Sequence, residues 1–229
     1  IETIIEGLNE SLQRLDLEYV DIFHLHGVHP QYYGYVMKDV VPALMKEKDK
    51  GKFRHLGITE LATVDPGHEV LIRAADEGCF DVFMIAFHLM HQTAKRALFP
   101  LTKNRHIGTL IMFAVRTLFS EPGRLQQNVR DLIHAGKLSE TLAGVSNPLD
   151  FLLHPDGAES VIDACYRYAR HTDGSDVVLF GTSSLKHLES NLASISKPPL
   201  PIADVIKIED LFQHLEGVGL DLPDPSKRI

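Results

Sequence analysis

Short apolar runs alternate along the chain with longer amphipathic segments. The short runs are rich in β-branched and aromatic residues, which is typical of buried strands. In the longer segments, apolar residues recur at helical spacing. The predicted strands are residues 19–26, 55–59, 82–87, 108–113 and 176–180. The predicted helices are residues 1–15, 33–50, 66–78, 93–103, 124–134, 158–171, 185–194 and 202–215.

The order of these elements predicts the fold class. Strands alternate with helices and no hairpin signal separates two strands, so we expect βαβ units and a parallel α/β sheet. No Gly-x-Gly-x-x-Gly or Walker motif follows a predicted strand, which argues against those two nucleotide-binding folds. The remaining expectation is a (β/α)8 TIM barrel with its active site at the carboxyl ends of the strands.

The number of strands and the first residues of the chain lead to a further expectation. Five strands do not close an eight-stranded barrel. The chain also starts at Ile1, without a methionine, and enters a predicted helix at once. We therefore expect about three N-terminal βα units to precede Ile1.

Length and composition predict one globular domain over residues 1–229, with residues 222–229 as a surface tail. The chain has 229 residues, of which 44% are hydrophobic and 24% are charged, as in ordinary globular proteins. Only Cys79 and Cys165 occur, far apart, so neither a disulfide framework nor a cysteine-rich metal site is expected.

The net charge and the lengths of the hydrophobic runs argue against some classes of binding partner. The formal net charge is −8, from 23 Lys+Arg against 31 Asp+Glu, which argues against nucleic acid and anionic membrane surfaces. No apolar run approaches the roughly 20 residues that cross a membrane. We therefore expect a cytoplasmic protein with a small-molecule partner, while the sequence gives no indication of oligomeric state.

Three segments, in order along the chain, resemble the aldo-keto reductases. Residues 11–26 (SLQRLDLEYVDIFHLH) are similar to the family's signature that runs into its catalytic histidine. Residues 51–59 (GKFRHLGIT) resemble its Gly-Lys-Ile-Arg…Gly-Val-Ser stretch, and residues 180–191 (FGTSSLKHLESN) resemble its cofactor-phosphate segment. The resemblance covers nearly the whole chain and corresponds to the part of the barrel from the third helix onward.

The resemblance implies an oxidoreductase that reduces an aldehyde or ketone to an alcohol, or catalyses the reverse, without a metal. The expected cofactor is NADP(H), with NAD(H) as the alternative. In the family a tyrosine acts as general acid beside a lysine–aspartate pair, and a histidine orients the carbonyl. His26 matches that histidine. The tyrosine, aspartate and lysine belong to the units expected before Ile1, because the tyrosines of this chain stand at other positions.

The resemblance also assigns candidate cofactor contacts. Thr59 and Glu60 match a Ser-Asn pair that holds the nicotinamide carboxamide, and Met84 stands where a glutamine commonly binds the same group. Met112 or Phe113 matches the position of an aromatic ring that stacks on the nicotinamide. The remaining candidates lie near the adenosine end: Gly181, Thr182, Ser183 and Ser184 facing the 2′-phosphate, Lys186 or His187 as the cation, and Asn191 at the adenine.

Two other functions are also consistent with the sequence. Glu60 and Met84 replace amides with side chains that cannot make the same bonds, which suggests a catalytically inactive reductase-fold protein with a binding or regulatory role. His24 and His26 form a His-x-His pair, which His88 and His91 could extend into the metal site of a TIM-barrel hydrolase. Arg116 is either a salt-bridge residue or part of the mouth of the site.

Overall fold

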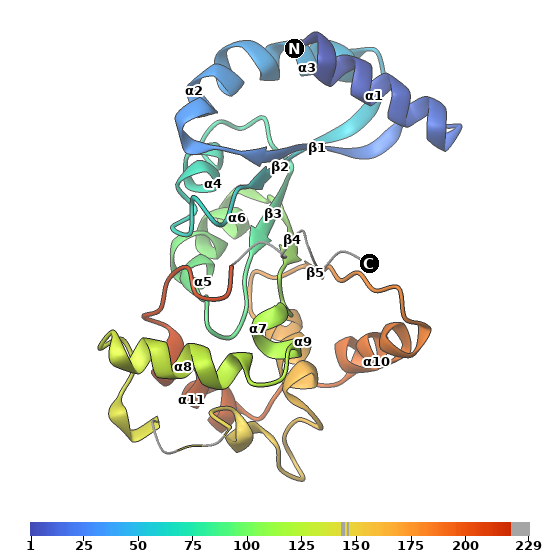
Figure 1. Cartoon of the computed structure of the whole chain (residues 1–229). Coiled ribbons are helices and arrows are strands. Elements are labelled where there is room, and N and C mark those ends of the chain that lie inside the picture. The colour runs from blue at the N-terminus through green and yellow to red at the C-terminus, as the bar shows by residue number, and fades with distance from the viewer. Residues whose placement is uncertain (143–144, 146, 221–229) are drawn as a thin grey trace.

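A computed structural model describes residues 1–142, 145 and 147–220; the predicted tail, residues 222–229, lies outside the described residues. The five predicted strands are present in one parallel sheet, in the order of the chain. They follow one another from β1 near the top of Figure 1 to β5 near its centre. Their bounds are β1 (Val20–Val28), β2 (Phe53–Glu60), β3 (Val82–Ala86), β4 (Gly108–Met112) and β5 (Val177–Val178).

Helices connect and cover these strands. The α-helices are α1 (Glu2–Leu15), α2 (Tyr33–Tyr35), α3 (Val41–Asp49), α4 (Glu69–Ala74), α5 (Thr93–Ala97), α6 (Phe99–Arg105), α7 (Thr117–Ser120), α8 (Arg124–His134), α9 (Val161–His171), α10 (Leu185–Ser196) and α11 (Ile202–Phe212). A π-helical turn spans Val36–Val40, and 3₁₀ turns span Pro30–Tyr32, Glu140–Leu142 and Asp150–Leu152.

Prolines explain two departures from the predicted helices. The predicted helix 33–50 contains the π turn, which ends two residues before Pro42 in the first turn of α3. The predicted helix 93–103 divides into α5 and α6 at Leu98, two residues before Pro100. Proline has no backbone N–H and clashes with the preceding turn, so the regular pattern of hydrogen bonds cannot continue through it.

Two elements are shorter than predicted, and each has an aspartate side chain bonded to backbone N–H groups near its start. The predicted helix 66–78 is reduced to α4, because the Asp65 carboxylate accepts the N–H groups of Glu69 and Val70 at 2.8 and 2.9 Å and sets the helix start there. The predicted strand 176–180 is reduced to β5. Its first residue, Asp176, accepts the Thr109 N–H through its carboxylate at 2.8 Å, outside the strand ladder.

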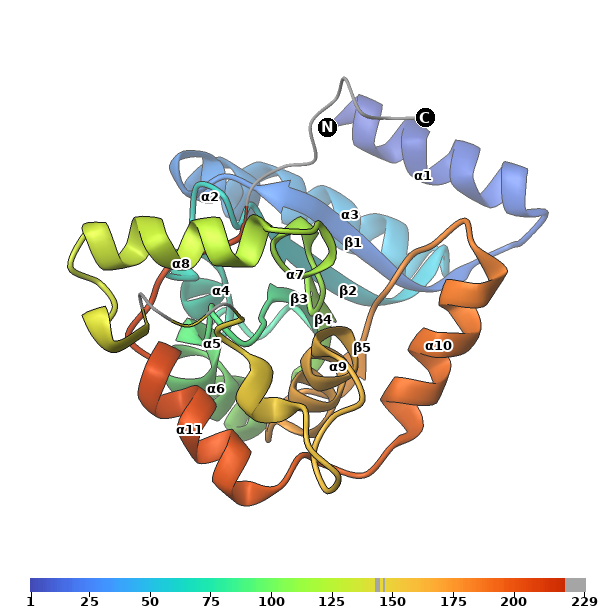
Figure 2. The same cartoon turned by 60° about the horizontal axis from the view of Figure 1, so that its bottom comes forward.

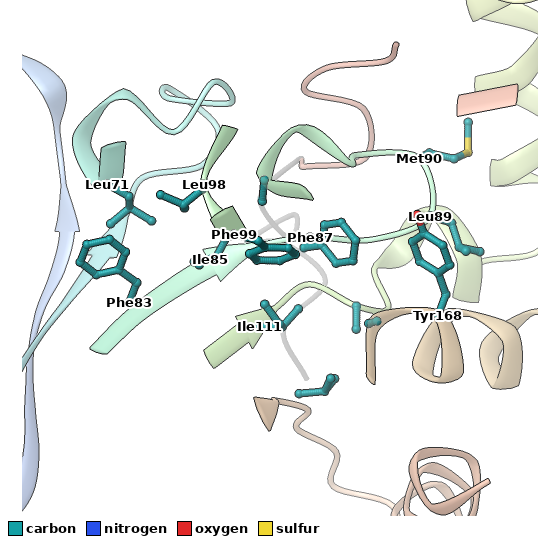
Figure 3. Close-up of a cluster of buried hydrophobic side chains, with 14 of the residues drawn as sticks. Leu71, Phe83, Ile85, Phe87, Leu89, Met90, Leu98, Phe99, Ile111 and Tyr168 are labelled. Atoms are coloured by element: carbon teal, nitrogen blue, oxygen red, sulfur yellow. The ribbon is translucent and has the colours of Figure 1, made fainter. Parts of the chain in front are cut away.

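The main core lies between the sheet and the helices (Figure 3). Phe83 and Ile85 alternate along β3 and are completely buried, and Phe87 continues the same face beyond the strand. The Phe87 ring lies 5.2 Å from the Phe99 ring and 5.7 Å from the Tyr168 ring, measured between centroids. This aromatic cluster therefore joins the end of β3 to α6 and α9.

The two edges of the sheet, over the residues that the structure describes, are β1 and β5. Figure 2 shows α1 beyond β1 and α10 beside β5. Because the strands are parallel, their carboxyl ends share one side of the sheet, which is where a barrel of this class carries its site. None of the described helices combines the length and the apolar character needed to cross a membrane.

Candidate functional site

The first four strands each carry one residue singled out from the sequence. His26 is near the end of β1, Thr59 near the end of β2, Met84 in β3, and Met112 at the end of β4. Thr59 pairs directly with Met84, and Ala86 pairs with Met112. The register therefore places Thr59 beside Met84, in the middle of β3, and Met112 two residues farther toward the carboxyl ends of the strands. His26 lies in the irregular stretch of the β1–β2 pairing, between Leu25 and Val28.

His26 and His24 differ in their surroundings. His26 is exposed, whereas the ring of His24 lies against Gly57 on the neighbouring strand. Both ring nitrogens of His24 are buried and have no hydrogen-bond partner among the described residues. Burial lowers the pKa of His24, and the nearby His26 lowers it further, so His24 is neutral at pH 7.

The His24 ring occupies the space that a side chain at position 57 would need, and glycine leaves that space free. A Cβ built on Gly57 would lie 2.4 Å from two atoms of the His24 ring. We expect Gly57→Ala to lower the free energy of unfolding by about 1–3 kcal/mol, as overpacking does in a filled interior. We expect the double variant Gly57→Ala/His24→Ala to lose less than the sum of its single variants, measured by urea denaturation. Additive losses would contradict this account.

Thr59 and Glu60 are both buried at the end of β2, each with 2% of its surface exposed. The Thr59 hydroxyl has no hydrogen-bond partner among the described residues. Both oxygens of Glu60 are engaged: Oε1 accepts the Ala86 N–H at 2.7 Å, and Oε2 lies 2.6 Å from His68 Nδ1. Burial raises the pKa of Glu60, while the bonds from His68 and Ala86 oppose that rise.

His68 extends this contact to a third element. Its Nε2 lies 2.8 Å from Thr93 Oγ1 at the start of α5, so a chain of polar contacts joins Glu60, His68 and Thr93. His68 is completely buried. No motif or spacing in the sequence pointed to His68 or Thr93, because the three residues meet only through the packing of α4 and α5 on β2.

The end of β4 leads into a turn that carries Arg116. Met112 and Phe113 pack against Ala62, Ala86 and Leu220, which form a small second apolar cluster. The Arg116 guanidinium lies over the Phe113 ring, 4.1 Å from its centroid. The positive φ of Phe113, 71°, turns the chain sharply at the strand end.

A cavity of about 660 Å³ opens between this turn, α9 and the start of α10. Four residues predicted to contact the adenosine end of the cofactor line it together: Gly181, Thr182, His187 and Asn191. Ser183 is exposed and is not part of this lining. Arg116 is also part of this lining.

The lining of this cavity favours a negatively charged ligand. It contains an arginine, a histidine and several hydroxyl groups but no aspartate or glutamate. The start of α10 also faces it, and a helix N-terminus carries partial positive charge. Ser184 caps that helix by accepting the His187 N–H at 3.3 Å, and Thr182 Oγ1 accepts the Ser184 N–H at 3.1 Å. No pattern in the sequence pointed to three further lining residues, which are Thr117, Ser160 and Tyr166.

The four histidines considered for a metal site differ in burial, and His26 is exposed. His88 and His91 are fully buried, with their ring centroids 5.9 Å apart, and His91 lies 5.4 Å from His68. Across residues 1–142, 145 and 147–220, no group of three or more His, Cys, Asp or Glu side chains is arranged to hold a metal ion.

Comparison with known proteins adds a family and a fold. The family model described as "Aldo/keto reductase family" matches residues 1–213. The chain is 27% identical over 198 residues to L-galactose dehydrogenase from Arabidopsis thaliana, covering 86% of this chain and 59% of that protein. The chain thus spans less than two thirds of the length of this relative.

Solved structures show the same architecture. An aldo-keto reductase from Bacillus halodurans superposes with a TM-score of 0.64 at 18% identity, over 91% of this chain and 66% of that one. An aldo/keto reductase from Klebsiella pneumoniae, solved with NADP and acetate, superposes with a TM-score of 0.62 at 20% identity, over 96% and 69%. The predicted fold class is therefore confirmed as that of the aldo-keto reductase (β/α)8 barrel, of which the described residues contain five strands.

Proposed function

The chain belongs to the aldo/keto reductase family, and on this basis we propose that the protein is an NADP(H)-dependent oxidoreductase that interconverts a small carbonyl compound and its alcohol. The observation that carries the proposal is the cavity of about 660 Å³ whose lining combines Arg116, His187, Asn191 and the start of α10. The relative from Klebsiella pneumoniae, solved with NADP, supports the choice of dinucleotide.

Residues of the cavity and residues of β2 and β4 suit different parts of such a cofactor. Asn191 offers an amide to the adenine, and the hydroxyl-rich wall with His187 faces the 2′-phosphate. Arg116 lies between that cavity and Phe113, so its charge offsets the negative charge of the bridging diphosphate. Met112 and the buried Thr59 hydroxyl are available to the nicotinamide end.

His26 is the proposed catalytic residue of this chain. NADPH, when bound, supplies the hydride. His26 is exposed near the carboxyl end of β1, so its N–H can donate to the carbonyl oxygen and stabilise the negative charge that develops there. The neutral His24 behind it adds no competing positive charge.

The proposal predicts that Arg116 contributes strongly to cofactor affinity. We expect Arg116→Gln to raise the Kd for NADPH by about tenfold to a hundredfold, because a charge-assisted bond to phosphate contributes roughly 1.5–3 kcal/mol. We also expect the loss to shrink as salt is added, because ions screen the charge in the wild type. Titration of NADPH fluorescence measures both effects.

Arg96→Gln is the matched control, since Arg96 is an exposed arginine in α5 and is not part of the cavity lining. We expect this control to bind NADPH nearly as well as the wild type. Equal affinities of Arg116→Gln and the wild type would contradict the placement of the diphosphate, and no binding by the wild type would contradict the cofactor proposal itself.

A second candidate function is binding of the dinucleotide without turnover. It is favoured by Glu60, whose two oxygens are both committed to internal contacts, and by Met84, whose thioether is a weak acceptor and not a donor. Consumption of NADPH with a panel of aldehydes, and its loss in His26→Ala, distinguishes the enzyme from the binding protein.

A further inference from the structure

The chain continues beyond α11 as an extended segment, residues 213–220, which we call the strap. It is the red segment that follows α11 in Figure 1. Three of its residues are buried: Leu215, Val218 and Leu220 have 1%, 8% and 2% of their surfaces exposed. The strap is therefore packed against the domain through apolar side chains, although it belongs to no helix or strand.

The strap reaches the carboxyl ends of two central strands. Leu220 forms the small second apolar cluster with Ala62 and Ala86, and Met112 and Phe113 pack against it. Ala86 is the last residue of β3 and Met112 the last residue of β4. Release of the strap would therefore uncover the side of the sheet on which a barrel of this class carries its site.

Two glycines let the strap lie close to its neighbours. Gly217 and Gly219 have φ values of 72° and 67°, in the left-handed region that favours glycine. A Cβ built on Gly219 would lie 2.6 Å from Leu118 and 3.5 Å from the His88 ring, and one built on Gly217 would lie 3.6 Å from Pro66. The strap thus runs between the segment before α4 and the short helix α7.

His91 binds the strap through its backbone. The Nδ1 atom of His91 accepts the Gly217 N–H at 3.2 Å, and the ring has no exposed surface. Its Nε2 lies 3.3 Å from Thr93 Oγ1, and the Thr93 hydroxyl donates to the Pro66 carbonyl at 3.2 Å. This arrangement requires a neutral ring that carries its proton on Nε2 and accepts at Nδ1.

His88 lies beneath the same strap. Its ring is completely buried, and the backbone of Val218 is close enough to oppose the fall in the His88 pKa that burial causes. The Nδ1 atom of His88 accepts the Met90 N–H at 3.2 Å, and the Phe119 ring packs edge-on against it at 5.3 Å between centroids. His88 is thus a second buried ring that accepts a bond and must be neutral to do so.

The groups around the two rings do not compensate for an added proton. The titratable or charged neighbours are His68 at the start of α4, with Glu60 of β2 behind it, Arg116 after β4, and the exposed Glu216 of the strap. Arg116 and the burial both lower the pKa of His88, and His68 and His88 lower that of His91. Among the residues that the structure describes, no carboxylate contacts either ring.

We propose that the strap is a pH-sensitive latch, which neutral His88 and His91 hold on the carboxyl ends of β3 and β4, and which opens when the two rings are protonated while the rest of the domain stays folded. A protonated Nδ1 of His91 is a donor facing the Gly217 N–H, a second donor, so this bond is lost. The apolar side chains of the strap do not respond to pH. They determine how rarely the strap opens, and the histidines determine how opening changes with pH. The latch does not depend on the identity of the cofactor.

The direction of the pH effect follows from the closed and open states. In the closed state burial holds the pKa of both histidines well below the usual value. In the open state the rings reach water and their pKa values return to about 6.5. Below that pH only the open state binds the two protons, so opening becomes more favourable as the pH falls.

Hydrogen exchange followed by mass spectrometry tests the latch. Exchange of the strap is compared with exchange of α9 between pH 7 and pH 5, with each rate divided by the intrinsic rate at the same pH. We expect the strap to be less protected than α9 at every pH. We also expect its protection factor to fall by about tenfold per histidine for each pH unit well below 6.5.

Two results would overturn the proposal. Equal protection of the strap and α9 at every pH would show that the strap opens only when the whole domain unfolds. A protection factor of the strap that does not change with pH would show that the histidines do not control its opening.

Asparagine variants identify the groups responsible. The amide oxygen of His91→Asn can accept the Gly217 N–H from a position near that of Nδ1, and it does not titrate. We expect this variant to lose about a tenfold change in protection per pH unit, and His88→Asn/His91→Asn to show no change between pH 7 and pH 5. If His91→Asn does not fold, His88→Asn alone should show the same loss. A wild-type slope in His88→Asn and in His91→Asn would contradict the latch.

His214→Asn is the matched control, because His214 is also a histidine of the strap. Its Nε2 lies 2.7 Å from the Lys137 carbonyl oxygen and therefore donates, so protonation of this ring leaves the bond intact. We expect His214→Asn to change the protection of the strap by a similar factor at every pH and to keep the wild-type slope. A slope reduced as far as in His91→Asn would overturn the role assigned to the two buried rings.

Discussion

Lowering the pH from 7 to 4.5 is expected to reduce the free energy of unfolding by about 5 kcal/mol through two buried histidines alone. His88 and His91 have no exposed surface. The Nδ1 atom of each ring accepts a backbone N–H, from Met90 for His88 and from Gly217 for His91, at 3.2 Å in both cases. A ring nitrogen can accept only while it is unprotonated, so the folded state holds both rings neutral.

The direction of the effect follows from the two states of the chain. Burial lowers the pKa of His88 to about 3 and, together with His88 and His68, lowers that of His91 to about 2. Arg116 lowers the pKa of His88 further. In the unfolded chain both pKa values return to about 6.5. Above pH 6.5 neither state binds these protons, whereas below it only the unfolded state does, so stability falls with pH until about pH 3.

Urea denaturation between pH 7 and pH 4.5 measures this effect. The histidines are expected to contribute about 1.4 kcal/mol each per pH unit below pH 6. His91→Gln should flatten the pH dependence by about that slope, even if it lowers stability at pH 7. His134→Gln, at an exposed position on α8, controls for the removal of a histidine. An unchanged slope in His91→Gln would contradict the account.

Truncating Phe87 is expected to lower the free energy of unfolding by about 3–5 kcal/mol, the usual range for a buried aromatic ring changed to alanine. The ring is completely buried between Phe99 and Tyr168, as Figure 3 shows. Its loss leaves a cavity and also removes two aromatic contacts. Since domains of this size are stable by only about 5–15 kcal/mol, Phe87→Ala should unfold at a much lower urea concentration.

Two controls separate packing from simple loss of hydrophobicity. Phe87→Leu retains most of the volume and is expected to cost about 1–2 kcal/mol. Leu192→Ala removes an apolar side chain that is 51% exposed on α10, so it should change stability by less than about 0.5 kcal/mol. A Phe87→Ala loss no larger than that of Leu192→Ala would show that the cluster does not stabilise the fold.

The elements of this chain were largely predictable because their signals are local. The all-apolar run at residues 82–87 and the β-rich run at residues 19–26 identified strands that the structure contains as β3 and β1. The helix ends were less accurate. Asp65 determines the start of α4 through bonds of its side chain to backbone N–H groups, and such competition between side chain and periodic pattern is not visible in hydrophobic spacing.

The candidate site divides in the same way between sequence and structure. The sequence alone determined the parallel α/β class, the position of His26 near the end of its strand, and the family resemblance, because these follow from periodicity and from short motifs. Only the tertiary structure placed Arg116 in the wall of the cavity and turned the Glu60 carboxylate toward His68 and Ala86. The physical reason is that the burial and partners of a polar side chain depend on residues far apart in sequence, which the packing of helices on the sheet brings within hydrogen-bond distance.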